Sequence, residues 1–365
     1  MRMMLKVLAN AITFSGYLAA TVAGHAQTVS FDTIQKYAPS IFMNAYDNNH
    51  PASVESFFAQ SVLVDQNGNT ISNTVTPAIL AANTSSSNYL RPANNVFPSS
   101  SNDFESGGSI VSAGNNTGQS NAPVYVKVID NGTSIDLKYY MFYTWNGFQG
   151  FQVGVITNFK TQPYFMNWSR FASHYGDWEH VTVRISEDTN TLIGVYYSQH
   201  GEAQFVATPS LDGTHPIVYP GWNSHANYAV SGTNINTQIL DSPGIIPVSW
   251  LKVVDVTTNS GNFVYYNKPN PFYSNGVQWK PWQDASQLVL LDNNAVAAQW
   301  LSFNGNWGPT VTNAIEHPPT LPSGATDELY TLAQGGNFLG LLSKYVVASG
   351  PQGPQTAGWN VSNEP

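Results

Sequence analysis

The residues best suited to chemistry form one short run at 174–180, with the sequence His-Tyr-Gly-Asp-Trp-Glu-His. The segment that follows, 181–185, alternates apolar and polar residues and predicts a strand, in which successive side chains face opposite ways. Asp177 and Glu179 therefore share the face of Val181, which should point into the core. Two inward-facing carboxylates are costly unless something compensates their charge. A bound divalent cation would do so.

His174 precedes Asp177 by three residues and can fold back towards the two carboxylates. We therefore predict a metal site formed by His174, Asp177 and Glu179. Segments 180–186 and 192–199 predict two strands joined by a turn after Glu187. If this turn is tight, the numbers of paired residues sum to about 377, which places His200 opposite Asp177. The residues predicted to complete or support the ligand shell are Asn146, His200 and His225, and His215 lies in a neighbouring segment.

The expected cation follows from the types of ligand. Carboxylate oxygens with one or two imidazoles suit Mg²⁺, Ca²⁺ or Mn²⁺ better than copper, and we expect magnesium or calcium in preference to zinc. Strand alternation alone supports a second explanation equally well. In that explanation Asp177 and Glu179 accept hydrogen bonds from buried backbone and tyrosine hydroxyl groups, and His174 is an ordinary core residue.

Other familiar chemistries lack their sequence signatures. The chain has no cysteine, which excludes cysteine nucleophiles and thiolate metal sites. It also has no GxSxG elbow, phosphate-binding loop, HExxH helix or dinucleotide fingerprint. Its formal net charge of −9 argues against nucleic acid as a partner and against simple electrostatic adsorption to anionic membranes.

The first residues resemble a secretory signal peptide. Arg2 and Lys6 precede an apolar stretch, and small residues follow it, so we expect residues 1–26 to be removed after Ala26. The protein would then be secreted as residues 27–365, with 11 basic residues against 22 acidic ones and a net charge of −11. No later segment is apolar enough to span a membrane. Sequons that predict a glycoprotein occur at Asn83, Asn115, Asn131, Asn167 and Asn360.

The composition favours strands over helices. Aromatic residues make up 13% of the chain and charged residues only 10%, and strand-like segments recur from Val124 onwards between turn signals. We therefore expect one mostly-β domain, a β-sandwich with loop insertions and a few short helices. Segments 124–130 and 133–145 predict one hairpin, and 180–186 and 192–199 predict a second. Residues 80–122, rich in serine and asparagine, predict a surface insertion.

Several motifs, in order, are similar to those of the vacuolar protein sorting-associated protein 62 family. They are "YAPSIFMNAYDNNHPASVESFF", "YYMFYTWNG", "GDWEHVTVRI", "YYSQHG", "HPIVYPGWNSHANY" and "FNGNWGP", which together extend over roughly residues 35–310. The resemblance implies kinship over most of the chain. The family's name refers to a sorting role, which defines no molecular activity. We do not transfer this role to a chain that we expect to be secreted.

A more distant resemblance concerns the site itself. Residues 173–179, Ser-His-Tyr-Gly-Asp-Trp-Glu, are similar to the Gly-His-Arg-His-Asp-Trp-Glu heptapeptide of necrosis- and ethylene-inducing-like proteins. That family holds a divalent cation on a cytolysin-like β-sandwich and binds sphingolipid head groups, so the resemblance implies metal ligation by His174, Asp177 and Glu179. Gly176 replaces the second histidine of the heptapeptide, and Asn146 aligns with a further metal-contacting aspartate.

Three functions are compatible with these residues. The leading hypothesis is a secreted, non-enzymatic protein whose divalent cation organises binding to a membrane lipid head group or a glycan, in a cytolysin-like manner. The alternative is a metal-dependent hydrolase of an ester, phosphodiester or glycoside, in which the cation activates water and His200 or His225 moves protons. In the third, the cation only stabilises the fold.

Overall fold

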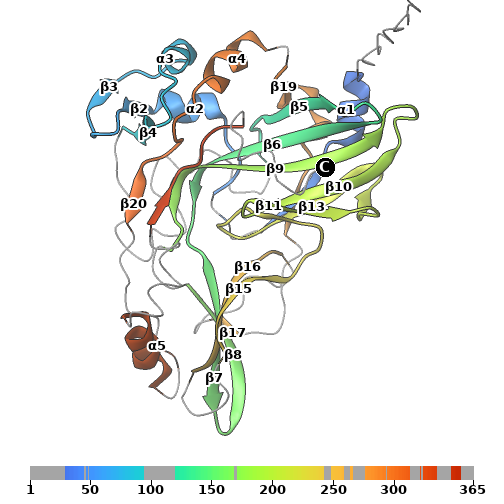
Figure 1. Ribbon diagram of the computed structural model, residues 1–365. Helices are drawn as coiled ribbons and strands as arrows, with labels where there is room; N and C mark the ends of the chain where they lie inside the picture. Colours follow the sequence, from blue (N-terminus) through green and yellow to red (C-terminus); the bar gives the residue numbers. More distant parts are fainter. Residues whose placement is uncertain are drawn as a thin grey trace, which may run out of the picture.

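The computed structural model describes residues 29–44, 47, 49–93, 120–167, 171–241, 248–258, 264–265, 276–292, 294–312, 321, 324–334 and 347–354. Strands make up 49% of the structure and helices 16%, which confirms the predicted mostly-β fold (Figure 1). The predicted signal segment lies outside the described residues, as do Asn115 and Asn360. None of the helices in the described part of the chain is long and apolar enough to cross a membrane.

A six-stranded sheet carries the functional residues. Its strand order is β11-β10-β9-β6-β5-β19, and both predicted hairpins belong to it as antiparallel pairs. The strands are β5 (Val124–Asp130), β6 (Ser134–Asn146), β9 (His174–Ser186), β10 (Leu192–Gln199), β11 (Glu202–Val206) and β19 (Leu288–Leu290). The long central strands β6 and β9 pair along their whole length.

A second sheet packs against one face of the first and completes a sandwich. Its order is β12-β13-β1-β18, with β14 paired to β13. Its strands are β1 (Ser40–Met43), β12 (Leu211–Asp212), β13 (His215–Pro220), β14 (Asn227–Tyr228) and β18 (Val277–Trp279). Val181 of the first sheet and Ile41, Val218 and Trp279 of the second belong to one buried cluster. Helix α1 (Phe31–Tyr37) begins at Ser30, whose hydroxyl accepts a hydrogen bond from the Thr33 amide, and adds Ile34 to this core.

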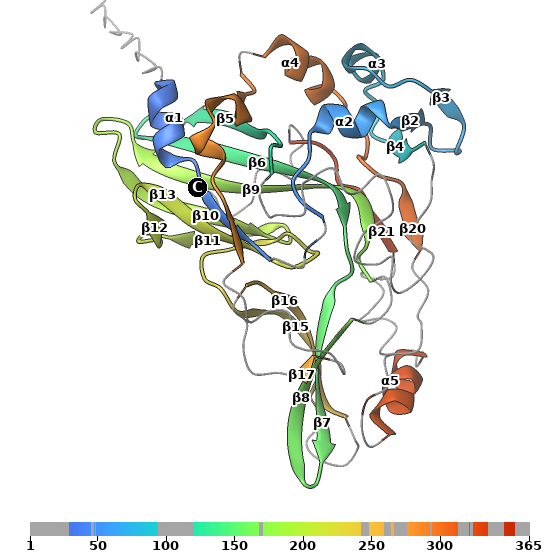
Figure 2. The same ribbon diagram turned by 180° about the vertical axis from the view of Figure 1, so that it is seen from behind.

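Helices and a small sheet cover part of the opposite face of the six-stranded sheet (Figures 1 and 2). They are α2 (Val54–Ala59), α3 (Pro77–Ala82) and α4 (Ala295–Leu301), with β2 (Ser61–Val64), β3 (Thr70–Ser72) and β4 (Tyr89–Pro92). This layer shares a second, aromatic core with β6 and β9. β4 corrects part of the predicted 80–122 insertion, because it is an ordered strand paired with β2, with Leu90 fully buried. Residues 94–119 of that insertion lie outside the described part.

A third sheet forms an arm at the far end from these helices (Figure 1). Its order is β15-β16-β7-β8-β17. The strands are β7 (Gly150–Thr157), β8 (Lys160–Asn167), β15 (Thr233–Asp241), β16 (Val248–Val256) and β17 (Val264–Tyr265). Helix α5 (Ala325–Gln334) packs Leu329 against this sheet. The short pair β20 (Thr310–Thr312) and β21 (Val347–Ser349) lies beside the start of β9.

Candidate functional site

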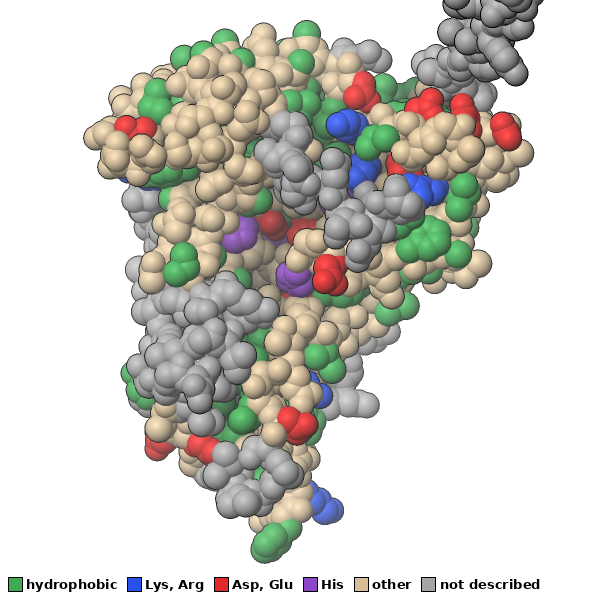
Figure 3. Space-filling model, in the orientation of Figure 1, with side chains coloured by type: hydrophobic (Ala, Val, Ile, Leu, Met, Phe, Trp, Pro, Cys, Tyr) green, Lys and Arg blue, Asp and Glu red, His purple; other side chains and the backbone are tan. Residues whose placement is uncertain are grey.

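The predicted site residues meet at a pocket of about 470 Å³. The pocket lies where the end of β6 and the start of β9 approach the β10–β11 turn, with β21 as a further wall. Histidine and acidic side chains gather in a hollow on this face of the molecule (Figure 3). The predicted ligands and supporting residues that line the pocket are Asn146, His174, Asp177, Glu179 and His200.

The strand alternation predicted for β9 is confirmed. In the β6–β9 register, Asp177 lies opposite Tyr143 and Glu179 opposite Met141, on the face that carries the sandwich core. Trp178 points the other way and packs in the aromatic cluster beneath the helices. The two carboxylates thus continue an apolar stripe to the edge of the core, where the stripe opens into the pocket.

Gly176 explains one departure from the heptapeptide. Its φ is +64°, and a Cβ at this position would lie 2.3 Å from the backbone oxygen of Trp307. A histidine cannot occupy such a position without moving the Trp307 backbone. The local conformation also fixes the preceding histidine, because the Nδ1 atom of His174 lies 2.9 Å from the Gly176 carbonyl oxygen. Burial lowers the pKa of His174, which favours its neutral form although Asp177 opposes the shift.

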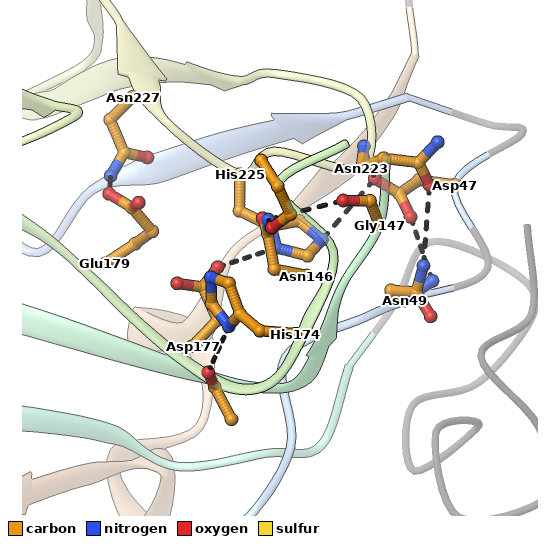
Figure 4. Close-up of polar contacts among 12 residues, drawn as sticks. Asp47, Asn49, Asn146, Gly147, His174, Asp177, Glu179, Asn223, His225 and Asn227 are labelled. Carbon is orange, nitrogen blue, oxygen red and sulfur yellow. Dashed lines mark hydrogen bonds and ion pairs between the residues drawn. The ribbon is translucent and has the colours of Figure 1, made fainter. Parts of the chain in front are cut away.

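Asp177 is supported from behind by a buried histidine (Figure 4). The Nδ1 atom of His225 lies 3.0 Å from an Asp177 carboxylate oxygen, and its Nε2 atom lies 3.7 Å from Asp47. The imidazole stacks on the Tyr143 ring at a centroid distance of 3.7 Å. His225 does not line the pocket, so the structure gives it a supporting position behind Asp177.

Glu179 stands apart from Asp177 in its contacts. Its carboxylate is 3.5 Å from the side-chain nitrogen of Asn227, a long hydrogen bond (Figure 4). Burial, followed by the negative charges of Asp177 and Asp255, raises the pKa of Glu179 well above its ordinary range. Glu179 is therefore favoured in a form that is either protonated or bound to a cation.

His200 is held by a carboxylate that the sequence did not single out. Its Nε2 atom lies 2.5 Å from Asp255, and the Tyr228 hydroxyl donates to the same oxygen at 2.5 Å. The Asp255 carboxylate is buried, which by itself would raise its pKa. The positive charge of His200 and hydrogen bonds from His200, Ser224 and Tyr228 nevertheless hold the pKa of Asp255 well below its ordinary value.

The predicted pairing of His200 with Asp177 needs a correction in register. β10 pairs with β9 at a sum of 377 only for Leu192 and Ile185, and a bulge then shifts the sum to 378. The pairing of β10 with β9 ends at Tyr197, and His200 lies in the turn to β11 with a φ of +50°. His200 reaches the pocket all the same, because that turn bends over it.

Asn146 ends β6 with its amide group oriented by the backbone. Its side-chain nitrogen donates to the carbonyl oxygens of Ala172 at 3.0 Å and Gly147 at 3.3 Å. Because the nitrogen is used in this way, the oxygen is the end that can meet a cation. The other predicted histidine, His215, lies away from the pocket and stacks on Trp282 at 3.7 Å.

The donor types fit a hard divalent cation, but they are not drawn together into a finished coordination shell. Across the described residues, no three His, Asp or Glu side chains are close enough to hold a metal ion as they stand. Asn227 nevertheless has a buried side-chain oxygen without a hydrogen-bond partner, close to Glu179. An amide oxygen beside a carboxylate is a type of ligand that Ca²⁺ and Mg²⁺ bind.

Sequence reasoning missed Asp47, Asp255 and Asn227. Asp255 carried a usable signal, since an acid inside the apolar run "VVDV" of β16 must find partners. Asp47 and Asn227 lie in loop-like or short segments where no periodicity indicates their direction. Their contacts with the site join residues 48 to 178 positions apart in the chain, which only the fold brings together.

Comparison with known proteins settles the family. Residues 20–246 match the model of the family described as vacuolar protein sorting-associated protein 62. The chain belongs to this family. One curated relative is the "Putative vacuolar protein sorting-associated protein TDA6" of Saccharomyces cerevisiae (strain ATCC 204508 / S288c), with 22% identity over 307 residues. The alignment covers 74% of this chain and 59% of the yeast protein, so this Vps62-family chain spans less than two thirds of its relative.

The similar solved structures are necrosis- and ethylene-inducing-like proteins. Protein 2 from the causal agent of cocoa's Witches Broom disease has 15% identity and a TM-score of 0.25, covering 75% of this chain and 91% of its own. The non-toxic HaNLP3 protein has 14% identity and a TM-score of 0.29, covering 75% and 82%. NLPPya in complex with glucosamine has 12% identity and a TM-score of 0.27, covering 80% and 85%. These low scores carry no functional argument for the Vps62-family chain.

Proposed function

We propose that this protein is secreted and non-enzymatic, and that a divalent cation in the pocket organises its binding to a membrane lipid head group or a glycan. The observation that supports the proposal most is the pair Asp177 and Glu179. Both carboxylates lie on one face of β9 and line the same pocket, where their negative charges repel each other. Magnesium or calcium is the expected cation.

Each residue would have a distinct part. Asp177 and Glu179 would provide the charge that holds the cation, and His225 would keep Asp177 in place. Asn146 would add a neutral oxygen. His174 would have to exchange its contact with the Gly176 carbonyl for one with the cation. A bound cation would supply positive charge that polar oxygens of a ligand can meet.

A metal-dependent hydrolase is the second candidate, and one contact favours it. The Nε2 atom of His200 lies against the buried carboxylate of Asp255, an arrangement in which an acid orients an imidazole for proton transfer. Turnover of an ester, phosphodiester or glycoside that is lost in His200→Gln would establish this activity. Binding without turnover would favour the non-enzymatic function.

The first test of the cation site is thermal unfolding in Ca²⁺ or Mg²⁺ and then in chelator. A cation at a hundred times its dissociation constant should stabilise the wild-type protein by about 2.7 kcal/mol, or about 4 °C for a chain of this size. Asp177→Asn should remove this difference. The matched control is Asp188→Asn, which changes an exposed acid in the β9–β10 turn and should keep the full shift. An equal shift in all three proteins would place the cation elsewhere.

Binding to the ligand should depend on the same cation. We expect Ca²⁺ or Mg²⁺ to strengthen the binding of wild-type protein to vesicles or glycans, and we expect chelator or Asp177→Asn to remove this cation-dependent part of the binding. Binding that is unchanged by chelator would contradict a cation-organised surface, even if the thermal shift were present.

The stabilisation by the cation should increase with pH. Because the folded-state pKa of Glu179 is raised, its contribution is fully present below the unfolded pKa of about 4.3 and is lost as pH rises. A cation meets the ionised carboxylate and offsets that loss. The difference in melting temperature between cation and chelator should therefore grow from pH 4 upwards. In chelator, the melting temperature of the wild type should fall as pH rises, and Glu179→Gln should reduce this fall. Parallel pH profiles for wild type and Glu179→Gln would show that Glu179 does not titrate in this way.

A further inference from the structure

The arm of the molecule ends in an aromatic side chain that is fully in water. β7 and β8 are joined by only two residues, Asn158 and Phe159, with φ values of +50° and +62°. Phe159 has a relative exposure of 104%, the highest among the exposed large hydrophobic residues of the described chain. Figures 1 and 2 place this hairpin tip at the end of the molecule away from α2, α3 and α4.

The local structure gives no reason for phenylalanine at this position. Tight two-residue hairpin turns with two positive φ angles favour Asn-Gly, and a residue with a Cβ costs roughly 1–2 kcal/mol in the left-handed region. Phe159 bears this cost and buries none of its ring. The side chain therefore weakens the turn that carries it. No contact with the described part of the chain offsets this cost.

The charges on the hairpin indicate the kind of surface it contacts. Lys160 is the only charged residue in 150–167, although the chain has 22 acidic residues. The carboxylates that reach the arm lie well back from the tip. Asp241 of β15 pairs with Trp250 of β16, which in turn pairs with Gly154 of β7. Glu328 accepts a hydrogen bond from the backbone amide of Val248, and Val248 pairs with Val155 of β7. Four or five residues of strand, about 13–17 Å, separate them from Phe159.

We propose that the β7–β8 tip inserts Phe159 into the interfacial region of a lipid bilayer, with Lys160 against lipid phosphates. A bilayer accepts a single protruding aromatic side chain without a preformed pocket, and an ammonium group beside the ring meets anionic head groups. The absence of carboxylates from the hairpin allows the close approach that the rest of this acidic chain opposes. This contact goes beyond the proposed cation site, because it requires no cation.

The tip and the pocket are separate points of attachment. Gln149 lines the pocket immediately before β7 begins, and the eight residues of β7 extend about 25 Å from there. One aromatic ring and one lysine give a weak contact. A weak contact gains importance when a second site on the same molecule holds the same membrane, because the local concentration of lipid is then high.

The experiment uses the full chain and the absence of native cysteine. Phe159→Cys is labelled with an environment-sensitive fluorophore and mixed with phosphatidylcholine vesicles, with or without phosphatidylserine, at millimolar lipid in chelator. We expect a blue shift in emission at position 159, larger with phosphatidylserine, and none at the matched position in Phe205→Cys, a partly exposed residue of β11. In vesicle sedimentation, Phe159→Ala should lower partition about tenfold and Phe159→Leu should restore most of it.

Two further variants separate this proposal from the cation site. Lys160→Ala should remove the preference for phosphatidylserine, whereas Asp177→Asn should leave the blue shift unchanged. An unshifted fluorophore at position 159 in both kinds of vesicle would overturn the proposal, and so would equal partition of wild type and Phe159→Ala. Neither result would alter a cation-dependent rise in melting temperature.

Discussion

Gly176→Ala is expected to destabilise the protein by about 2–5 kcal/mol and to abolish the stabilisation by the cation. The new Cβ would lie 2.3 Å from the Trp307 backbone oxygen and would hold a φ of +64°. Left-handed strain contributes about 1–2 kcal/mol, and displacement of packed backbone adds about 1–3 kcal/mol. Because Gly176 lies between His174 and Asp177, relief of the clash would also move both predicted ligands. Denaturant unfolding with and without cation measures the two effects.

The matched control for Gly176 is Gly213. Its φ is +67°, almost the same, but a Cβ there would have no atom within 4 Å. Gly213→Ala should therefore show only the cost of the left-handed conformation, about 1–2 kcal/mol, and keep the response to cation. Equal losses in both variants would mean that the Trp307 backbone yields, and that Gly176 is needed for its φ alone.

Trp178→Ala is expected to cost about 3–5 kcal/mol, the usual range for removing a large aromatic side chain from a core. Trp178 is 2% exposed and makes ring contacts with centroids 4.9 Å from Phe142, 5.6 Å from Trp307 and 5.7 Å from Tyr125. Its indole joins β9 to the helical layer. Chemical denaturation measures the loss, and it should exceed that of Trp282→Ala, where the indole is only partly buried.

Trp178 also tests the separation of the two faces of β9. Because its side chain lies opposite Asp177 and Glu179, folded Trp178→Ala should still gain stability from the cation. Asp177→Asn should behave in the reverse manner, with a smaller loss of stability and no response to cation. If Trp178→Ala folds but no longer responds to cation, the tryptophan positions the site as well as the core.

The heptapeptide resemblance takes on a structural meaning in this context. All four matched positions line the pocket, but His174, Asp177 and Glu179 bring polar groups to it, whereas Trp178 packs its ring in the aromatic cluster under the helices. The motif therefore combines side chains for a site with one side chain for packing. The family match makes kinship with vacuolar protein sorting-associated protein 62 certain, while the cation and the ligand remain our proposals.

The sequence by itself determined four of the six strands of the central sheet, β5, β6, β9 and β10. The hairpin of β5 and β6, the hairpin of β9 and β10, and the faces of Asp177 and Glu179 all follow from local alternation and turn residues. These features are predictable because a strand has a period of two residues and a short turn fixes its neighbour. The directions of the pocket side chains on β9 are predictable for the same reason.

Only the tertiary structure decided what surrounds those carboxylates. The bulge near Ile193 altered the register by one residue, and the turn at His200 then directed its imidazole to Asp255, 55 positions away. His225 reaches Asp177 from the turn between β13 and β14 of the other sheet, while Asp47 approaches from the segment after β1. Contacts between distant segments depend on how sheets pack and where chains turn, and no local period in the sequence encodes them.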